Sequence, residues 1–413
     1  MTNPPRDVRM SGFRNRSTVS EAWTWLDSFL EAVSTDVETI PIEQSYGRCL
    51  ASPVISQIDV PGFDRSAMDG YAVLADETTG ASEYNPIRLS IIGQSMPGAG
   101  YARVLAKSQA VRIMTGAPLP QGANAVVPVE YTTADGEEVL VTTTVGQDKH
   151  IGRVGEDIKA GSTILQPGRR LRPQDVAVIA SIGNDEVKVR RQPRVRILVT
   201  GNELVRAGQE KLPHQIYEAN SSILLGTVPR DGGVIESIQF VEDKETAISA
   251  ALKSPGADVI LVSGGSSVGA EDFAPGLVAQ LGELPVHGIA MRPSSPTGMG
   301  RIGESLVVLL PGNPVSCLCA YDFFASRAIR RLAGERTDWA YQSKEFPLGK
   351  KIVSAIGRVD YCRMKIENEV AIPLAISGAS ILSSTTRADG FVIVPSESEG
   401  LPAGANVNVM LYG

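Results

Sequence analysis

The chain has 413 residues, a formal net charge of −7 at pH 7 and 43% hydrophobic residues. This length suits about two to four globular domains. The acidic balance argues against nucleic acid as a partner, because nucleic-acid-binding surfaces are rich in Lys and Arg. The 41 glycines and 26 prolines favour many turns and short strands over a helical bundle.

The four cysteines indicate neither a disulfide framework nor a zinc site. Cys317 and Cys319 stand in one apolar stretch, and Cys49 and Cys362 are isolated. None has the spacing of zinc ligands, so we expect buried free thiols. The start of the chain lacks a signal-peptide pattern, and no run of about eighteen apolar residues occurs. These observations predict a soluble, cytoplasmic protein.

Residues 1–17 predict a disordered basic tail, because they carry several arginines and few apolar side chains. A helix is expected next. Thr18 and Glu21 have the spacing of a capping box, in which each side chain bonds to a backbone N–H at the start of a helix. The apolar side chains that follow recur at helical spacing and predict a helix facing a core: Trp23, Leu26, Leu30 and Val33.

Residues 45–190 predict a β-rich region, since short apolar runs alternate there with Gly, Pro, Asn and Asp. The runs cover 87–92, 110–114, 125–129 and 139–143. Residues 159–193 then predict a strand, a helix that begins at Pro173 and a further strand, with a charged end that resembles a linker.

From residue 194 the pattern changes to alternating strands and helices. Buried-strand patterns cover 195–201, 234–241, 258–265 and 305–312, and helices are expected from Asn220, over 244–254 and over 313–333. This alternation predicts a mostly parallel sheet with helices on both faces, and such sheets bind ligands at the carboxyl ends of their strands. Residues 341–413 return to short strands and predict a small all-β domain.

Three of the predicted strands end in glycine-containing turns. Glycine lets the main chain approach a ligand and expose its N–H groups. At one sheet edge, three such turns predict a cradle for phosphate-like oxygens, although glycine after a strand is also ordinary turn chemistry. The residues assigned to the cradle are Gly201, Ser263, Gly264, Gly265, Ser266, Pro311, Gly312 and Asn313.

Carboxylates gather around these turns. Glu203, Asp243 and Asp272 all fall at the same end of the predicted sheet. Oxygen ligands beside a phosphate site suit Mg²⁺. The alternative is that acids at helix N-termini complement helix dipoles, which would suit Asp243 and Asp272. The three histidines, His150, His214 and His287, stand beside no nucleophile, which argues against serine-hydrolase chemistry.

The run PGFDRSAMDGYAV, residues 61–73, is by itself typical of a tight turn into an edge strand, with Ala67 and Met68 expected to be buried. Together with five further segments it resembles the molybdopterin molybdotransferase family, which includes the E domain of gephyrin. The other segments are RIMTGAPLPQGANAVVPVE (112–130), GEDIKAG (155–161), TGNEL (200–204), SGGSSVGAEDF (263–273) and LPGNPVS (310–316). All six occur in order, in a resemblance that runs from about residue 18 to 413.

The resemblance implies an elongated homodimer of multi-domain α/β and β protomers. A central three-layer α/β/α domain with a mostly parallel sheet, residues 194–335, is expected to bind molybdopterin. A β-rich domain is expected at 59–155, a discontinuous linking domain at 18–58 and 156–193, and a β-barrel-like C-terminal domain at 336–413. The active site is expected between the α/β domain of one subunit and the β-rich domain of the other.

The family inserts molybdate into adenylated molybdopterin with Mg²⁺ and releases AMP, so a molybdopterin adenylyltransferase is implied as a pathway partner. Glu203, Asp243 and Asp272 are expected to hold the metal. The family's catalytic positions fall on Asp64, Thr115, Asp157, Glu203, Asp243 and Asp272. Arg292 and Arg358 match substrate-binding basic positions.

The chain departs from the family pattern at four positions. Asn202 replaces an aspartate, Arg292 and Ser295 replace lysines, and Val154 replaces an arginine. Ser295 and Val154 remove positive charge from a site that has to attract oxyanions, Arg292 keeps its charge, and Asn202 removes a carboxylate. These changes leave open an alternative: a gephyrin-like dimeric scaffold that binds a peptide segment of a membrane or cytoskeletal (cell-division) protein. A pterin- or nucleotide-binding regulator without turnover lies between the two.

Overall fold

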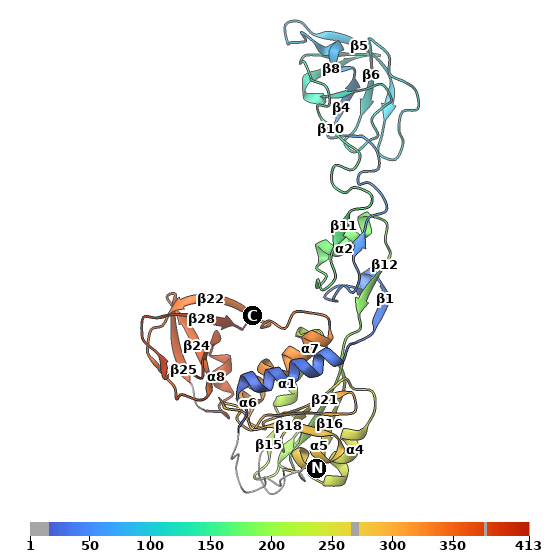
Figure 1. Ribbon diagram of the computed structural model, residues 1–413. Coiled ribbons are helices and arrows are strands. Elements are labelled where there is room, and N and C mark those ends of the chain that lie inside the picture. Colours follow the sequence, from blue (N-terminus) through green and yellow to red (C-terminus); the bar gives the residue numbers. More distant parts are fainter. Residues whose placement is uncertain (1–15, 266–271, 376–377, 413) are drawn as a thin grey trace.

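The computed structural model describes residues 16–265, 272–375 and 378–412. It shows an elongated chain in which a β-rich domain lies at one end, and the α/β and C-terminal domains lie at the other (Figure 1). Most of the predicted basic tail, residues 1–15, lies outside the described residues. Within the ranges described, no helix combines the length and apolar character needed to span a membrane.

The first helix, α1 (Val19–Ala32), begins with the predicted capping box. The backbone N–H of Glu21 donates to the Thr18 hydroxyl at 3.1 Å, and the Thr18 N–H donates to the Glu21 carboxylate at 2.7 Å. Leu26 and Leu30 are buried on one face of the helix. The prediction of a core-facing helix is therefore confirmed.

The core that α1 joins differs from the one predicted. The sequence grouped residues 18–58 in a linking domain, but α1 packs on α7 (Ser326–Leu332) of the α/β domain. The indole Nε1 of Trp23 donates to the Phe323 carbonyl at 2.8 Å. The apolar face of α1 is covered there, so the helix extends the α/β core instead of the linking segment.

The linking segment is built from two stretches of chain far apart in the sequence. β1 (Val37–Pro41) pairs antiparallel with β12 (Glu186–Arg190), so the outgoing and returning strands lie side by side (Figure 1). The predicted helix begins at Pro173, as α2 (Pro173–Ser181). The other elements are the 3₁₀ turn Ile42–Gln44, β2 (Val54–Ile55) and β11 (Thr163–Leu165).

The β-rich domain contains a sheet with the strand order β7-β4-β6-β5-β9-β8. Its strands are β4 (Gly70–Val73), β5 (Ile87–Ser95), β6 (Gln109–Ile113), β7 (Ala125–Pro128), β8 (Thr132–Asp135) and β9 (Glu138–Val141), with 3₁₀ turns at Ala75–Thr78 and Val129–Tyr131. A separate pair, β3 (Arg65–Ser66) and β10 (Ile151–Gly152), lies beside it. Ala67 is exposed and Met68 half-buried, so the expectation that both are buried was wrong. These two residues belong to the polar turn between β3 and β4 and not to the strand that follows.

The α/β domain is built on a mixed sheet with the order β16-β13-β17-β21-β20-β18. The first four strands of this order run parallel, and β20 and β18 continue the sheet antiparallel. The strands are β13 (Arg194–Thr200), β16 (Val234–Val241), β17 (Val259–Ser263), β18 (Glu283–His287), β20 (Gly298–Ile302) and β21 (Ser305–Leu310), with a small pair β14 (Leu204–Val205) and β15 (Ile216–Tyr217). The sequence predicted the parallel strands but not the antiparallel pair.

Helices cover both faces of this sheet. On one face Ile197 and Leu261 pack in a cluster with α1, α3 (Asn220–Arg230) and α7. On the other face their neighbours Leu198 and Ile260 pack in a cluster with α4 (Glu245–Lys253) and α5 (Ala274–Leu281). Alternate residues of a strand point to opposite faces, so the continuous apolar strands give a three-layer arrangement.

The predicted helix over 313–333 contains one irregular turn. α6 (Pro314–Ala320) continues through a π-helical turn, Tyr321–Ala325, into α7. A π turn inserts an extra residue into a helix and is often found at functional or strained positions. Here it places the side chains of Tyr321 and Asp322 inside the protein, where both are buried.

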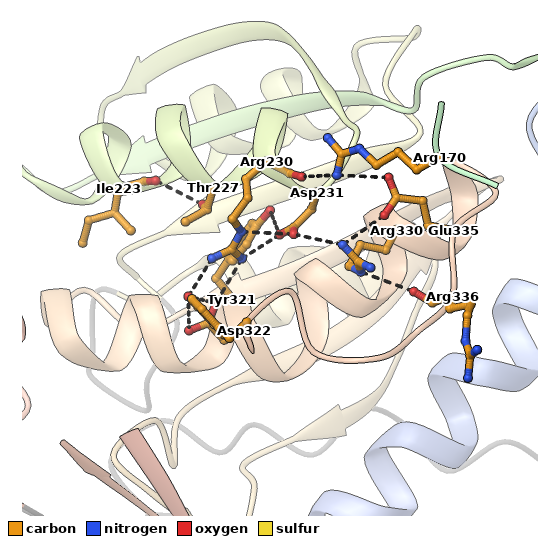
Figure 2. A network of polar contacts seen from close by, with 11 residues as sticks. Arg170, Ile223, Thr227, Arg230, Asp231, Tyr321, Asp322, Arg330, Glu335 and Arg336 are labelled. Carbon is orange, nitrogen blue, oxygen red and sulfur yellow. Dashed lines mark hydrogen bonds and ion pairs between the residues drawn. The ribbon is translucent and has the colours of Figure 1, made fainter. Parts of the chain in front are cut away.

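A buried network of charged side chains surrounds this turn (Figure 2). Asp231 accepts hydrogen bonds from Arg230 at 2.8 and 3.1 Å and from the Tyr321 hydroxyl at 3.0 Å. Asp322 accepts from the Tyr341 hydroxyl at 2.9 Å and from Arg230 at 3.3 Å. Burial raises the pKa of Asp322 to about 7. Tyr341 leads into the C-terminal domain, so the network connects that domain to α3.

The same network reaches the linking segment through Arg170. Its guanidinium donates to the carbonyl oxygen of Arg230 at 3.0 Å and lies 3.4 Å from the Glu335 carboxylate (Figure 2). Arg330 lies 3.0 Å from Glu335 and 3.8 Å from Asp231. Side chains from the linking, α/β and C-terminal regions therefore meet in one set of contacts.

The C-terminal domain is a sheet with the order β19-β24-β26-β28-β22, and β25 pairs with β24. Its elements are β19 (Met291–Arg292), β22 (Gln342–Pro347), β23 (Ile352–Val353), β24 (Val359–Glu367), β25 (Val370–Ala375), α8 (Ser383–Thr386), β26 (Gly390–Val394), β27 (Gly400–Leu401) and β28 (Asn406–Leu411). Leu348, just after β22, bridges to Ala371 in β25, so the sheet curls back on itself.

The four cysteines, Cys49, Cys317, Cys319 and Cys362, are free and buried, as predicted. Burial raises the pKa of the Cys362 thiol to about 12 and that of the Cys49 thiol to about 11. Thiolates at these sites are disfavoured at neutral pH, which fits a packing role.

Candidate functional site

A cleft of about 570 Å³ lies at the carboxyl ends of β13, β17 and β21. The three glycine-containing turns predicted from the sequence border it together. Its lining includes Gly201, Ser263, Gly264, Gly265, Pro311, Gly312 and Asn313 from the predicted cradle. Ser266, the remaining residue of the predicted cradle, lies outside the described residues.

Gly264 is a position in this cleft where glycine is required. Its φ is +93°, and a Cβ there would lie 2.2 Å from the carbonyl oxygen of Thr200. The Gly264 N–H donates to the carbonyl of Leu310 at 3.2 Å, which joins the ends of β17 and β21. The close approach of the three strand ends therefore depends on the missing side chain.

Asn220 holds two of these turns together. Its Nδ2 donates to the Ser263 hydroxyl at 2.9 Å and to the carbonyl of Gly312 at 2.8 Å. The side chain is buried at the first residue of α3. Glu218, also buried, accepts from the backbone N–H of Ser221 at 2.8 Å and so ties down the same helix start.

The three predicted carboxylates, Glu203, Asp243 and Asp272, line the same cleft. Asp243 accepts the backbone N–H of Asn202 at 3.1 Å, and the Asn202 side-chain oxygen accepts the Asp243 N–H at 3.4 Å. These reciprocal bonds fix the turn after β13 against the turn after β16. Asp243 and Asp272 also stand two residues before α4 and α5. They therefore also suit the alternative interpretation, in which acids at helix N-termini complement helix dipoles.

The three carboxylates do not close into one metal-binding group. Among the described residues, no set of three or more His, Cys, Asp or Glu side chains is close enough to hold an ion. The prediction that Glu203, Asp243 and Asp272 act together as direct ligands is therefore not supported by their geometry. Glu203 follows β13, Asp243 lies between β16 and α4, and Asp272 lies between β17 and α5. The three carboxylates therefore come from different turns along the cleft.

A second cavity, of about 340 Å³, adjoins the cleft. The two share Pro296, Pro311 and Asn313 in their linings. Arg292 lines this cavity and forms an ion pair with Asp360. Arg358 is not among the described residues that line either cavity, but its Nε lies 3.1 Å from the same carboxylate.

Asp64, Thr115 and Asp157 lie together in the β-rich domain, around the pair β3–β10. The Leu119 N–H donates to the Asp64 carbonyl at 2.8 Å, and the Gly116 N–H donates to the Ser66 carbonyl at 2.8 Å. Asp157 follows the turn after β10. These bonds join the loops that carry Asp64 and Thr115, and the Asp157 N–H donates to the Val60 carbonyl at 3.1 Å.

This cluster does not reach the cleft within one chain. Figure 1 shows the β-rich domain at one end of the elongated chain, with the linking segment between it and the α/β domain. The predicted catalytic residues therefore form two groups: Asp64, Thr115 and Asp157 in the β-rich domain, and Glu203, Asp243 and Asp272 in the cleft.

Family models match almost the whole chain. Residues 17–183 match the MoeA N-terminal region (domain I and II), residues 196–331 a probable molybdopterin binding domain, and residues 345–412 the MoeA C-terminal region (domain IV). Molybdopterin molybdenumtransferase 2 of Mycobacterium tuberculosis is 32% identical over 90% of this chain and 94% of its own length. The chain belongs to the MoeA family.

Two further relatives extend this similarity. The molybdopterin molybdenumtransferase of Bacillus subtilis is 32% identical over 91% of this chain and 90% of its own length. The crystal structure of the molybdopterin biosynthesis MoeA protein from Pyrococcus horikoshii OT3 is 30% identical, covers 96% of this chain and 100% of that chain, and superimposes with a TM-score of 0.81. The multi-domain α/β fold with mixed sheets is thus a MoeA fold.

The structure changes the interpretation of one departure from the MoeA pattern. Val154 stands where the family has an arginine, but the neighbouring Arg153 forms ion pairs with Asp64 and Asp148. The Val154 N–H donates to the Asp64 carboxylate at 3.0 Å. A guanidinium therefore still lies beside Asp64. The comparison of Val154 with the family pattern did not predict this.

Several residues at these sites were not predicted from the sequence. In the β-rich domain, Asp69 accepts the backbone N–H and the hydroxyl of Thr115 at 2.7 and 2.8 Å, and these bonds lower the pKa of Asp69. The signal for Asp69 was its place in the 61–73 run. Asn220 and Glu218 were detectable only as polar residues at a helix start, a pattern typical of ordinary capping.

Substitution of Gly264 by Ala is expected to disrupt the cleft. The added Cβ would force the β17 turn away from Thr200 and would strain a left-handed backbone, at a cost of about 1–3 kcal/mol. Chemical denaturation should show this loss. Gly312→Ala is the matched control, because the nearest atom to a Cβ there lies at 3.7 Å, an ordinary contact. Equal stability of the two variants would contradict the requirement for glycine at 264.

Proposed function

We propose that this MoeA-family chain is a molybdopterin molybdenumtransferase, which inserts molybdate into adenylated molybdopterin and releases AMP. The observation that carries the proposal is the cleft. It brings three glycine-containing strand ends and three carboxylates together, in a chain whose named transferase relatives match about nine-tenths of its length. A substrate with phosphate and heterocyclic parts suits a cleft of about 570 Å³ at this edge of the sheet.

The cleft residues suit a phosphate-bearing ligand. Glycine turns of this kind can present backbone N–H groups to a ligand. Asn220 holds two of these turns together. The Thr200 hydroxyl lines the cleft, is buried and has no hydrogen-bond partner among the described residues. We infer that these groups bind the phosphate oxygens of adenylated molybdopterin and that Asn202 holds Asp243 in place beside them.

We also propose that Mg²⁺ binds here through one or two of the carboxylates Glu203, Asp243 and Asp272. Magnesium commonly uses one or two protein carboxylates and completes its shell with waters and substrate phosphates, so a closed set of three ligands is not needed. When bound, the ion would neutralise charge on the phosphate oxygens. The protein's own part is to hold the carboxylates and glycine turns on one side of the substrate.

We further propose that the active unit is a homodimer. The β-rich domain carries Asp64, Thr115 and Asp157 far from the cleft of its own chain (Figure 1). A second protomer that brings its β-rich domain to this cleft would unite the two groups of predicted catalytic residues. The predicted domain limits, the adenylyltransferase as pathway partner and a peptide partner of a scaffold all stay predictions.

The function is tested by following AMP. Full-length protein incubated with adenylated molybdopterin, Mg²⁺ and molybdate is expected to release AMP in a molybdate-dependent way, and Asp243→Ala should reduce the rate by two orders of magnitude or more, about the effect of removing a central catalytic group. Glu242→Ala is the matched control, because the neighbouring Glu242 is 68% exposed and pairs only with the exposed Lys244 among described contacts.

Two results would count against the transferase. One is AMP release by the wild-type protein no faster than by Asp243→Ala. The other is equal loss of activity in Glu242→Ala and Asp243→Ala, since that would indicate damage to the turn and not to the chemistry. An inactive protein that still retained a membrane or filament protein in both variants would favour the scaffold.

A further inference from the structure

Asp360 is a buried carboxylate that pairs with two arginines from different segments of the chain. Its side chain is 0% exposed, whereas the side chains of Arg292 and Arg358 are 32% and 33% exposed. One carboxylate oxygen, Oδ2, pairs with Arg292 and accepts the Ser354 hydroxyl at 2.8 Å. The other, Oδ1, lies 3.1 Å from the Nε of Arg358. The carboxylate thus contacts three side chains.

The backbone fixes this arrangement across the boundary between two domains. β19 belongs to the stretch that follows β18 of the α/β domain, and it adds to the edge of the C-terminal sheet. It runs parallel to β24, with Arg292 opposite Asp360 and Met291 opposite Val359. The Val359 N–H donates to the Ala290 carbonyl at 2.9 Å and extends this pairing. The strand pairing therefore places the side chain of Arg292 beside the Asp360 carboxylate.

Arg292 also lines the cavity of about 340 Å³. The cavity is also lined by the hydroxyl-bearing residues Ser294, Ser295 and Ser316. The Ser295 hydroxyl oxygen and the Arg292 Nε are buried, and neither has a hydrogen-bond partner among the described residues. Two guanidinium groups and one carboxylate leave one positive charge in excess. An oxyanion is the ligand that would use both this charge and the unpaired donors.

We propose that Asp360 is a positioning residue that orients the Arg292 guanidinium toward an oxyanion in this cavity. The oxyanion is molybdate or a phosphate group of adenylated molybdopterin, so the assignment rests on the proposed function. An arginine side chain has several rotatable bonds, and a carboxylate that holds one nitrogen of its planar guanidinium keeps the remaining N–H groups oriented for a ligand. Arg358 shares the carboxylate and holds it from the other side.

Positioning and charge neutralisation predict opposite results for Asp360→Asn. The substitution removes a negative charge. If Asp360 only neutralised the arginines, the affinity for the oxyanion would therefore rise. If Asp360 positions Arg292, the affinity falls, because the guanidinium loses its anchor. We expect a fall of about tenfold, the effect of a hydrogen bond to a charged group.

The test is calorimetric binding of molybdate and of inorganic phosphate to the full-length protein, together with the KM of AMP release for each substrate. A tenfold weaker binding of molybdate with a kcat within about threefold of wild type supports positioning at molybdate. A raised KM for adenylated molybdopterin with unchanged molybdate binding assigns the cavity to its phosphate. Unchanged or tighter binding of both anions and unchanged KM values overturn the proposal.

Two further variants separate folding from positioning. Ser354→Ala keeps every charge and removes only the hydroxyl bond to Asp360, so it should weaken the same anion about threefold, less than Asp360→Asn because the carboxylate keeps both of its arginines. If Asp360→Asn does not fold, an unchanged anion affinity in Ser354→Ala overturns the proposal.

Asp389→Asn is the matched control in the same domain. Asp389 is exposed, accepts the Ile366 N–H at 2.6 Å and lines neither cavity in the described chain. Anion binding without AMP release by wild type would reject the proposed function and leave the positioning role standing.

Discussion

A heterodimer of two inactive variants, Asp64→Ala in one chain and Asp243→Ala in the other, is expected to have about half of the wild-type activity. If each active site combines the β-rich domain of one chain with the cleft of its partner, one site of this heterodimer unites two intact groups. The other site carries both substitutions. Each homodimeric variant carries one defect in every site and should release AMP at a background rate.

The expectation follows from where the two groups lie. Asp64 is in the β-rich domain and Asp243 is in the cleft, at opposite ends of the elongated chain (Figure 1). Within one chain the linking segment, with its β1–β12 pair, lies between the two groups (Figure 1). A second chain is a route by which the β-rich cluster can reach a cleft.

The measurement uses two differently tagged chains, co-expressed and purified through both tags, with AMP release as the readout. The matched control is a heterodimer of Asp64→Ala and Thr115→Ala, which places a defect in both β-rich domains and should stay inactive. Background activity in the Asp64/Asp243 heterodimer would show that the site is not shared between chains. Activity in the Asp64/Thr115 heterodimer would show that one of these residues is not required.

Much of the α/β domain was predictable, because its signals are local. Continuous apolar strands that end in glycine, such as 195–201 and 258–265, alternate with helical patterns, and the structure contains β13, β17 and the intervening helices at these places. A parallel sheet then places the strand ends at one edge. This rule is enough to bring Gly201, Gly264 and Gly312 to one cleft.

The remaining features depend on contacts between distant segments. The helical pattern of α1 predicts an apolar face but does not say which core covers it, and the structure shows α7 in that place. The ion pair between Arg153 and Asp64 crosses 89 residues of sequence, and that between Arg292 and Asp360 crosses 68. Comparison of single positions with the family pattern therefore missed the cation beside Asp64. It also did not predict the carboxylate that Arg292 and Arg358 share.

Substitution of Asp231 by Ala is expected to destabilise the α/β domain by about 3–5 kcal/mol, the range for removing one partner of a buried ion pair. Asp231 is fully buried and accepts bonds from Arg230 and from the Tyr321 hydroxyl. Its removal leaves the Arg230 guanidinium with fewer acceptors inside the protein, and Arg330 loses a carboxylate at 3.8 Å. The cost is mainly that of a guanidinium that keeps only Asp322 as a nearby carboxylate in the described chain and of a buried Tyr321 hydroxyl that loses its Asp231 acceptor.

Urea unfolding followed by tryptophan fluorescence measures this loss where it occurs, because all three tryptophans, Trp23, Trp25 and Trp339, pack against the same core. Asp338→Ala is the matched control. Asp338 is 67% exposed and pairs with the exposed Arg336, and such surface pairs contribute about 0–1 kcal/mol. A loss of less than about 1 kcal/mol in Asp231→Ala would mean that water or rearranged side chains satisfy Arg230. The network in Figure 2 would then join the linking, α/β and C-terminal regions without stabilising them, and their relative orientation would have to be held by the apolar contacts of α1 and the π-helical turn.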